Sequence, residues 1–264
     1  MIRKNLRKLY DKLTLKAYRT EVAANQQKQI QQTERLYEQL FLNNPVLVVN
    51  DVKIFLPLFY VDHIQKIIFA SRDFYEKETL QYLKNNFNSF DNILDIGSNI
   101  GNHMLFYCSQ LEAKKVYCFE PNKYNYTILS RNVELNNLQE IVTLHNMAVG
   151  EKSGRGVEKD FTMMNTGMNR IETGSATDSS EKNIEIVCLD DFNYTSIDFV
   201  KIDVEGSEIA VLKGAVKTLQ RTRPVVMIET FENNQSAVDE IMQSYGYSKS
   251  ATVEDYNSIY SPAN

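Results

Sequence analysis

Three apolar stretches of the chain each lead into a carboxylate. Asp95 follows residues 93–94, Glu120 follows residues 116–119, and Asp203 follows residues 199–202. In open α/β sheets, ligands bind in the crevice outside the carboxyl ends of the strands. A carboxylate there can accept hydrogen bonds from hydroxyl or ammonium groups, or take up a proton. The spacing therefore predicts a ligand site at one edge of a sheet.

The first stretch turns through two glycines into a predicted helix, in the run Asp95-Ile96-Gly97-Ser98-Asn99-Ile100-Gly101-Asn102-His103. Glycines allow a tight turn and close approach of a ligand to the backbone. The start of the helix suits a carboxylate group of that ligand. A dinucleotide site has a third glycine, in the pattern G-x-G-x-x-G. The D-x-G-x-N-x-G spacing is instead typical of the first motif of S-adenosylmethionine-dependent methyltransferases, although a purely structural turn is an alternative.

Glu120 lies 25 residues after Asp95 and is followed by Pro121, a good first residue for a helix. An acid at the end of the second strand accepts hydrogen bonds from a ribose diol. Such an acid fits a nicotinamide cofactor equally well. An NAD(P)-dependent oxidoreductase is therefore the alternative enzyme, and Tyr245 and Lys249 form a Tyr-x-x-x-Lys pair that would belong to it.

The third stretch carries Lys201, Asp203 and Glu205, which alternation along an extended strand would place on one side. Asp203 is the first candidate to take an acceptor's proton or to hold its hydroxyl in line. No zinc spacing of Cys and His occurs. A divalent cation held by Asp203, Glu205 and Glu229 is an alternative that we do not favour, so no metal is expected.

The ordered segments LDIGSNIGNH, FEPN, NMAVG, DFVKIDVEGSE, VLKGA and RPVVMIE resemble the FkbM family of methyltransferases over residues 50–262. The resemblance implies a class I methyltransferase fold, S-adenosylmethionine as cofactor, and O-methylation of a sugar, glycan or glycan-like hydroxyl. A methyltransferase fold kept as a non-catalytic binding module is a further alternative.

The resemblance also implies roles for individual residues. The methionine part of the cofactor would lie on the glycine turn, the ribose at Glu120 and Pro121, and the adenine beside the segment after the third strand. His103 would face the cofactor or acceptor, or merely cap its turn, and the loop 160–180 would meet the acceptor. The expected cofactor residues are Asp95, Gly97, Ser98, Asn99, Gly101, Asn102, Glu120, Pro121, Asn146, Met147 and Ala148. The expected catalytic residues are Asp203, Glu205, His103 and Lys201.

These residues require a scaffold of alternating strands and helices. Apolar periodicity predicts strands at 92–96, 115–120, 141–145, 198–203 and 224–230. It predicts helices at 102–111, 122–136, 206–221 and 233–245. Such alternation favours a mostly parallel, doubly wound α/β sheet, to which 247–252 and 256–260 would add a closing antiparallel pair. The Gly-, Ser- and Thr-rich stretch 150–182 is expected to be an irregular loop.

Three regions are expected. Residues 1–44 form a helical segment for packing or oligomerisation, and residues 45–90 hold strands at 46–49 and 53–59 and a helix at 74–87. Residues 91–264 form the cofactor-binding domain. The basic face of the first segment is interpreted as solvated, with self-association into a homo-oligomer or peripheral contact with an anionic membrane as alternatives.

The composition narrows the class of partner and the location. A net charge of −5 gives no basic footprint for nucleic acid. No apolar run reaches the roughly 18 residues of a transmembrane helix. No secretory signal is recognised, and three cysteines suit a reducing compartment. We therefore expect a cytoplasmic protein.

Overall fold

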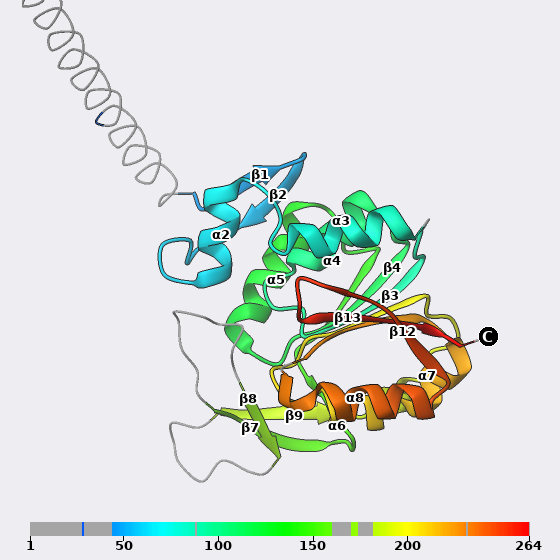
Figure 1. Cartoon of the computed structure of the whole chain (residues 1–264). Coiled ribbons are helices and arrows are strands. Elements are labelled where there is room, and N and C mark those ends of the chain that lie inside the picture. Colours follow the sequence, from blue (N-terminus) through cyan, green and yellow to red (C-terminus); the bar gives the residue numbers. More distant parts are fainter. Residues whose placement is uncertain are drawn as a thin grey trace, which may run out of the picture. The chain divides into compact units, whose positions relative to one another are not determined.

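The computed structural model describes residue 28 and residues 44–87, 89–159, 170–173, 182–230 and 232–263 (Figure 1). The chain divides into two units, Met1–Pro45 and Val46–Asn264, and the second is described below. The predicted helical segment 1–44, with its self-association or membrane contact, lies almost entirely outside the described residues. In the part of the chain that is described, no helix is long and apolar enough to cross a membrane.

A seven-stranded sheet forms the centre of the unit, with the strand order β12-β13-β11-β10-β3-β4-β5 among the described residues. The strands from β5 to β11 run parallel, and β13 and β12 close the sheet antiparallel to them. The predicted mostly parallel sheet with a closing antiparallel pair is therefore confirmed. Its strands are β3 (Asn92–Ile96), β4 (Lys115–Phe119), β5 (Val142–His145), β10 (Phe199–Ile202), β11 (Val225–Glu229), β12 (Tyr247–Val253) and β13 (Asn257–Pro262).

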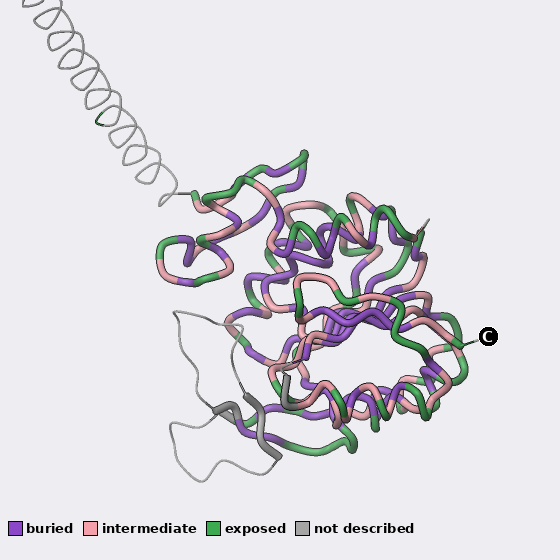
Figure 2. Tube along the Cα trace, viewed as in Figure 1, coloured by how far each residue is buried: buried purple, intermediate pink, exposed green. Residues whose placement is uncertain are grey.

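Helices cover both faces of this sheet (Figure 1). The helices on one face are α3 (Lys77–Asn86) and α4 (Asn102–Gln110), and those on the other are α6 (Glu208–Lys213), α7 (Val216–Thr222) and α8 (Glu232–Ser244). The second face buries a large apolar cluster that includes Leu94, Val200, Val226 and Met242. Figure 2 shows buried residues concentrated along the central strands. Apolar burial on both faces is the expected reason that these strands are almost continuously hydrophobic.

The helix α5 (Lys123–Leu135) follows β4 and begins at a side-chain cap, because Asn122 Oδ1 accepts hydrogen bonds from the amides of Tyr124 and Asn125. Its side chains also hold the hairpin of β1 (Val46–Val49) and β2 (Val52–Phe55). Asn132 Oδ1 accepts from Phe55 N at 2.6 Å, and Asn136 Oδ1 accepts from Lys53 N at 2.9 Å. This hairpin therefore belongs to the same unit as the central sheet.

Residues 56–76 differ from the expected arrangement. The second strand ends at Phe55 rather than at residue 59, and a helix not predicted from the sequence, α2 (His63–Ser71), follows. Asp62 caps it by accepting a hydrogen bond from the amide of Gln65. The predicted helix 74–87 begins later, at Lys77, because Glu76 takes a left-handed backbone conformation with φ of 54°.

The stretch 150–182 was wrongly expected to be one irregular loop. It contributes β7 (Gly154–Lys159) and β8 (Arg170–Thr173), which join β6 (Ala148–Val149) and β9 (Lys182–Val187) in a second sheet of order β6-β9-β7-β8. Residues 160–169 and 174–181, and with them most of the expected acceptor loop 160–180, lie outside the described residues. Polar strands that pair antiparallel with each other carry little apolar periodicity, which explains the error.

The single helix predicted at 206–221 is instead two helices. It breaks at Gly214, where a Cβ would overlap the carbonyl oxygen of Gly150. The Gly214 carbonyl accepts a hydrogen bond from the amide of Asp190, at the start of the 3-10 helix η1 (Leu189–Phe192). A contact with distant backbone therefore ends α6, which local propensity could not reveal.

The turn between β12 and β13 is fastened to the start of α3. Glu254 Oε2 accepts hydrogen bonds from Thr79 Oγ1 at 2.6 Å and from Thr79 N at 3.2 Å. Thr79 N is one of the amides that a helix leaves without an internal partner at its first turn. A carboxylate 175 residues away thus supplies the cap that Glu76, the residue before the helix, does not provide.

The turn after β3 depends on Gly97. Its φ is +81°, and a Cβ there would overlap the Asp203 carbonyl oxygen, which belongs to the backbone beyond β10. We expect Gly97→Ala to lower the free energy of unfolding by roughly 3 kcal/mol or more, since neither the turn nor β10 can move without breaking strand pairing. The control is Gly154→Ala, because a Cβ at Gly154 meets no atom within 4 Å. Urea unfolding of both variants tests this, and equal stability would contradict it.

Candidate active site

The glycine turn is hydrogen-bonded to the end of the neighbouring strand, β4. The amides of Gly97 and Ser98 both donate to the carbonyl oxygen of Phe119, at 2.9 and 3.0 Å. The hydroxyl of Ser98 donates to the carbonyl oxygen of Asp95 at 2.7 Å. Asn99 takes a left-handed conformation with φ of 49°, as asparagine tolerates better than most residues. The turn therefore has a fixed shape that presents its backbone at the carboxyl end of the sheet.

The side chain of Glu120, at the end of β4, also forms hydrogen bonds with this turn. Its Oε2 accepts from the amide of Asn99 at 2.8 Å, and its Oε1 accepts from the amide of Asn122 at 2.8 Å. Burial raises the pKa of this carboxyl to about 7, although both backbone hydrogen bonds oppose the rise. Each carboxylate oxygen keeps a second lone pair, so Glu120 can still accept hydrogen bonds from a ligand diol.

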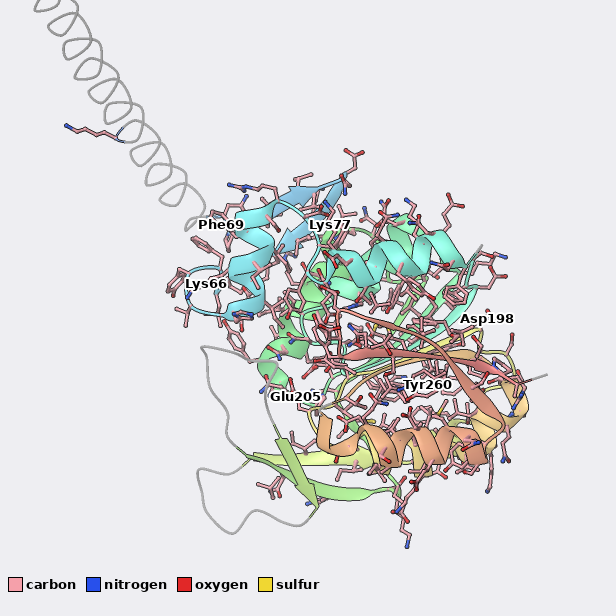
Figure 3. The ribbon with its side chains drawn as sticks, viewed as in Figure 1. Lys66, Phe69, Lys77, Asp198, Glu205 and Tyr260 are labelled. Carbon is pink, nitrogen blue, oxygen red and sulfur yellow. The ribbon has the colours of Figure 1, made fainter. Side chains whose placement is uncertain are left out.

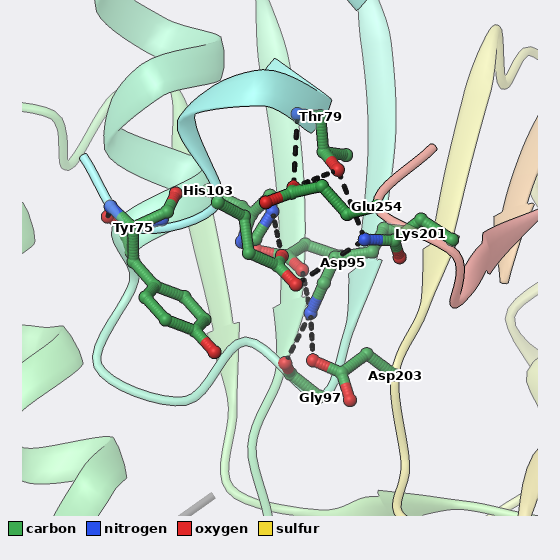
Figure 4. Close-up of polar contacts among 11 residues, drawn as sticks. Tyr75, Thr79, Asp95, Gly97, His103, Lys201, Asp203 and Glu254 are labelled. Carbon is green, nitrogen blue, oxygen red and sulfur yellow. Dashed lines mark hydrogen bonds and ion pairs between the residues drawn. The ribbon is translucent and has the colours of Figure 1, made fainter. Parts of the chain in front are cut away.

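Lys201 joins the ends of β3 and β10 (Figure 4). Its Nζ donates to the carbonyl oxygen of Gly97 at 2.8 Å and to Asp203 Oδ2 at 3.0 Å, and lies 3.6 Å from Asp95 Oδ1. Lys201 and Asp95 are direct partners in the register of these strands, which explains why their side chains meet. The prediction that Lys201 and Asp203 lie together agrees with this geometry.

The Lys201 side chain is only 4% exposed, whereas that of Asp203 is 26% exposed. Burial alone would favour the neutral amine, but Asp203 and Asp95 outweigh it and hold the pKa of Lys201 above its usual value. Lys201 is therefore a buried cation that orients other groups. Asp203 is the member of the pair that is partly exposed to solvent.

Asp95 is completely buried, and neither of its carboxylate oxygens has a hydrogen-bond partner among the described residues. Buried polar groups are almost always satisfied, so such a carboxylate indicates a missing donor. Lys201, 3.6 Å away, compensates its charge without making a hydrogen bond.

Glu205 departs from the predicted alternation. β10 ends at Ile202, and Glu205 lies in the following turn with φ of 50°, so it does not continue the strand face of Lys201 and Asp203. Glu208 begins α6, and its Oε1 accepts from the amide of Gly206 at 2.6 Å. In the described parts of the chain, no group of three or more His, Cys, Asp or Glu side chains is arranged to hold a metal ion, which includes the alternative set Asp203, Glu205 and Glu229.

His103 and Asn102, in the first turn of α4, contact the segment before α3. His103 Nε2 lies 3.0 Å from Glu76 Oε2, and both side chains are less than a tenth exposed. The side-chain amide of Asn102 forms two hydrogen bonds with the backbone of Tyr75. It accepts from the Tyr75 amide at 2.9 Å and donates to the Tyr75 carbonyl oxygen at 3.1 Å. Burial raises the pKa of Glu76, but His103 outweighs this and holds it below its usual value. His103 is thus buried against Glu76 and does not solvate its turn.

Residues 146–148 continue from β5 beside Glu120. The side-chain amide of Asn146 donates to the carbonyl oxygens of Glu120 at 2.8 Å and Pro121 at 3.1 Å. Met147 is half-buried and Ala148 is buried in β6. The structure therefore brings the expected ribose and adenine segments side by side.

Several polar residues near the site were missed from the sequence. Tyr75, Glu76, Tyr256 and Asn257 gather at the carboxyl edge of β10 and β11 through contacts between distant segments, such as the hydrogen bond from Asn257 Nδ2 to Glu76 Oε1 at 3.4 Å. Glu229, named above only as a metal alternative, ends β11 opposite Asn257. The sequence shows an acid at position 76 before an amphipathic helix, but the left-handed conformation of Glu76 could not be predicted from the sequence.

This sheet order, with its glycine turn after the first parallel strand and an acid ending the next, defines the class I methyltransferase fold. Residues 95–249, more than half of the chain, match the methyltransferase FkbM domain. The chain belongs to the FkbM methyltransferase family.

Similar proteins support this placement. Hexuronic acid methyltransferase AglP of Haloferax volcanii is 28% identical over 153 residues, which cover 58% of this chain and 61% of AglP. Methyltransferase 1 of Beauveria bassiana is 24% identical over 46% of this chain and 57% of its own length. The matched part thus spans less than two thirds of either relative. The crystal structure of an FkbM methyltransferase from Methylobacillus flagellatus superposes with a TM-score of 0.52 at 18% identity, over 75% of this chain and 52% of that one.

The buried carboxyl of Glu120 makes stability depend on pH. Its pKa rises from 4.5 to about 7 on folding. A raised folded-state pKa contributes stability that is complete below about pH 4.5 and is lost as the pH rises toward 7. The loss should be on the order of 3 kcal/mol over this window. Urea unfolding between pH 4.5 and 8 should show the wild type losing about 3 kcal/mol relative to Glu120→Gln as the pH rises; parallel curves would refute the assignment.

Proposed function

We propose that this protein transfers the methyl group of S-adenosylmethionine to a hydroxyl oxygen of a sugar, glycan or glycan-like acceptor. The observation that carries the proposal is that side-chain hydrogen bonds connect the ends of three neighbouring strands. Glu120 holds the glycine turn through Asn99, and Lys201 holds it through Gly97 while also binding Asp203. A ligand lying on that turn would therefore contact Glu120 on one side and face Asp203 on the other.

The residues fit the cofactor that the family implies. Asp95 has no hydrogen-bond donor of its own among the described residues, and the ammonium group of a methionine moiety is such a donor. The turn from Gly97 to Asn102 would hold the methionine part. Glu120 and Pro121 would hold the ribose, and the segment from Asn146 to Ala148 would lie beside the adenine. The cofactor would supply an activated methyl group on a positively charged sulfur.

The chain's own contribution is orientation and proton uptake. Because the sulfonium is already a good leaving group, alignment of the acceptor oxygen should supply much of the rate. Asp203 is partly exposed, so its carboxylate can hold the acceptor hydroxyl and take its proton. Lys201 keeps that carboxylate in place. Glu205 lies in the turn that follows Asp203 (Figure 3), and we assign His103, buried against Glu76, a positioning role.

The acceptor class rests on similarity and on the site. AglP, a relative of this chain, is named for methylation of a hexuronic acid. Tyr75 and Tyr256 stand beside Glu76 and Glu229, which influence the pKa of both phenols. Aromatic rings and carboxylates offer a sugar apolar contact together with hydrogen-bond acceptors. Membership of a methyltransferase family favours this reaction over the NAD(P)-linked alternative.

The division of roles predicts different defects. Asp95→Ala and Glu120→Ala should weaken cofactor binding roughly tenfold or more, because each removes a charged hydrogen-bond acceptor. Asp203→Ala should leave cofactor affinity within about threefold of the wild type and slow turnover on the order of a hundredfold. Calorimetry with S-adenosylmethionine measures the first effect. Transfer of a radiolabelled methyl group to a panel of sugars and glycans measures the second.

The matched control is Asp91→Ala, an acid at the opposite end of β3 that pairs with Lys114 on the surface. It should change neither binding nor turnover. Equal loss of cofactor affinity in the Asp95, Glu120 and Asp203 variants would contradict the assigned roles. Absence of any heat with S-adenosylmethionine or its demethylated product would defeat the proposed function.

A further inference from the structure

Three carboxylates gather beside the glycine turn, and we call Glu76, Asp203 and Glu229 the carboxylate cluster. Ile202 and Ile228 are register partners in β10 and β11, so Asp203 and Glu229 leave the sheet side by side. Glu76, just before α3, is linked to them through Asn257, whose Nδ2 donates to Glu76 Oε1 at 3.4 Å and which is the register partner of Glu229. The three carboxyl groups therefore lie near one another although they come from three distant segments of the chain.

Positive charge is scarce around this cluster. Lys201 serves both Asp203 and Asp95, so one ammonium group is divided between two carboxylates. In the described ranges, Glu76 and Glu229 form no ion pair with a lysine or arginine; the basic group that Glu76 contacts is His103, at 3.0 Å. Burial, followed by Asp203 and Glu76, raises the pKa of Glu229 to about 9. Burial and the two neighbouring carboxylates thus both disfavour a negative charge on Glu229.

A second observation points to a missing cation. Asp95 lies on the other side of Lys201, is completely buried, and has no hydrogen bond to either oxygen within the described residues. Buried carboxylates are retained when a partner compensates them, and the shared Lys201 does so only in part. The ammonium group that the cofactor and its demethylated product share would supply this partner, so Asp95 anchors both compounds and the choice between them falls to the carboxylate cluster.

We propose that the carboxylate cluster makes this site select the positively charged sulfonium cofactor over its neutral, demethylated product. The inference rests on the proposed function and adds a specificity-determining role for Glu76. With a pKa of about 9, the carboxyl of Glu229 is protonated near neutral pH and adds no negative charge of its own. Transfer of the methyl group removes the positive charge from the sulfur. The product therefore loses its attraction to the carboxylates at the moment it forms, while its nucleoside contacts remain.

The expected size follows from Coulomb's law. A unit charge several ångströms from a partly solvated carboxylate changes a binding constant by roughly tenfold. S-adenosylmethionine should therefore bind roughly tenfold more tightly than S-adenosylhomocysteine. An unreactive analogue with an ammonium group in place of the sulfonium methyl should bind like the cofactor, because it carries the same charge.

Calorimetric titration of the full chain with these three compounds, in the presence of a metal chelator, tests the proposal. Glu76→Gln keeps the shape of the side chain and removes a charge, so it should reduce the preference for the cationic ligands about threefold or more, chiefly by weakening their binding. Glu140→Gln, an exposed acid in the loop before β5, is the control and should leave the preference unchanged.

The outcomes separate the two proposals. Binding of all three compounds with equal affinity, or tighter binding of S-adenosylhomocysteine, would overturn the selection rule while leaving the proposed function standing. An unchanged preference in a folded Glu76→Gln variant would overturn the role of Glu76. If none of the compounds binds, the proposed function fails and this inference fails with it.

Discussion

The site depends on one buried ammonium group. Lys201 Nζ bonds the Gly97 carbonyl and the Asp203 carboxylate and compensates the charge of Asp95, so it ties the glycine turn to the neighbouring strand. A buried cation is costly unless its partners surround it, and here they come from both strand ends. The requirement runs both ways, because Asp95 is completely buried and Lys201 is the cation that lies beside it. The geometry of the turn and the position of Asp203 are therefore set together.

Much of this arrangement could be predicted from the sequence. Apolar stretches of strand length alternate with amphipathic helices, so the sheet and its parallel order followed from local pattern. Asp95, Glu120 and Asp203 each end such a stretch, and parallel strands bring their carboxyl ends to one edge. Lys201 was found because it is two residues before Asp203, where alternation places both side chains on one face. Hydrophobic periodicity, together with the rule that parallel strands end at the same edge of a sheet, was sufficient to predict these features.

The remainder depends on contacts between distant segments. Nothing local distinguishes Glu76 from other acids before a helix, yet its left-handed backbone and its contact with His103 give it a place in the site. The break at Gly214 comes from the carbonyl of Gly150. The second sheet is formed by polar strands whose pairing, rather than composition, makes them regular. Strand alternation was also extended too far at Glu205, where the chain had already turned.

The attachment of Glu254 to Thr79 has a consequence for the order in which the site is completed during synthesis. Strands β3 and β4, which carry the turn and Glu120, leave the ribosome long before the β12–β13 turn. Chains fold progressively as they emerge. The glycine turn and Glu120, where we propose that the nucleoside binds, can therefore take shape on a nascent chain before Tyr256 and Asn257 are synthesised. Folding intermediates of this protein would thus acquire the proposed cofactor site before the proposed acceptor site.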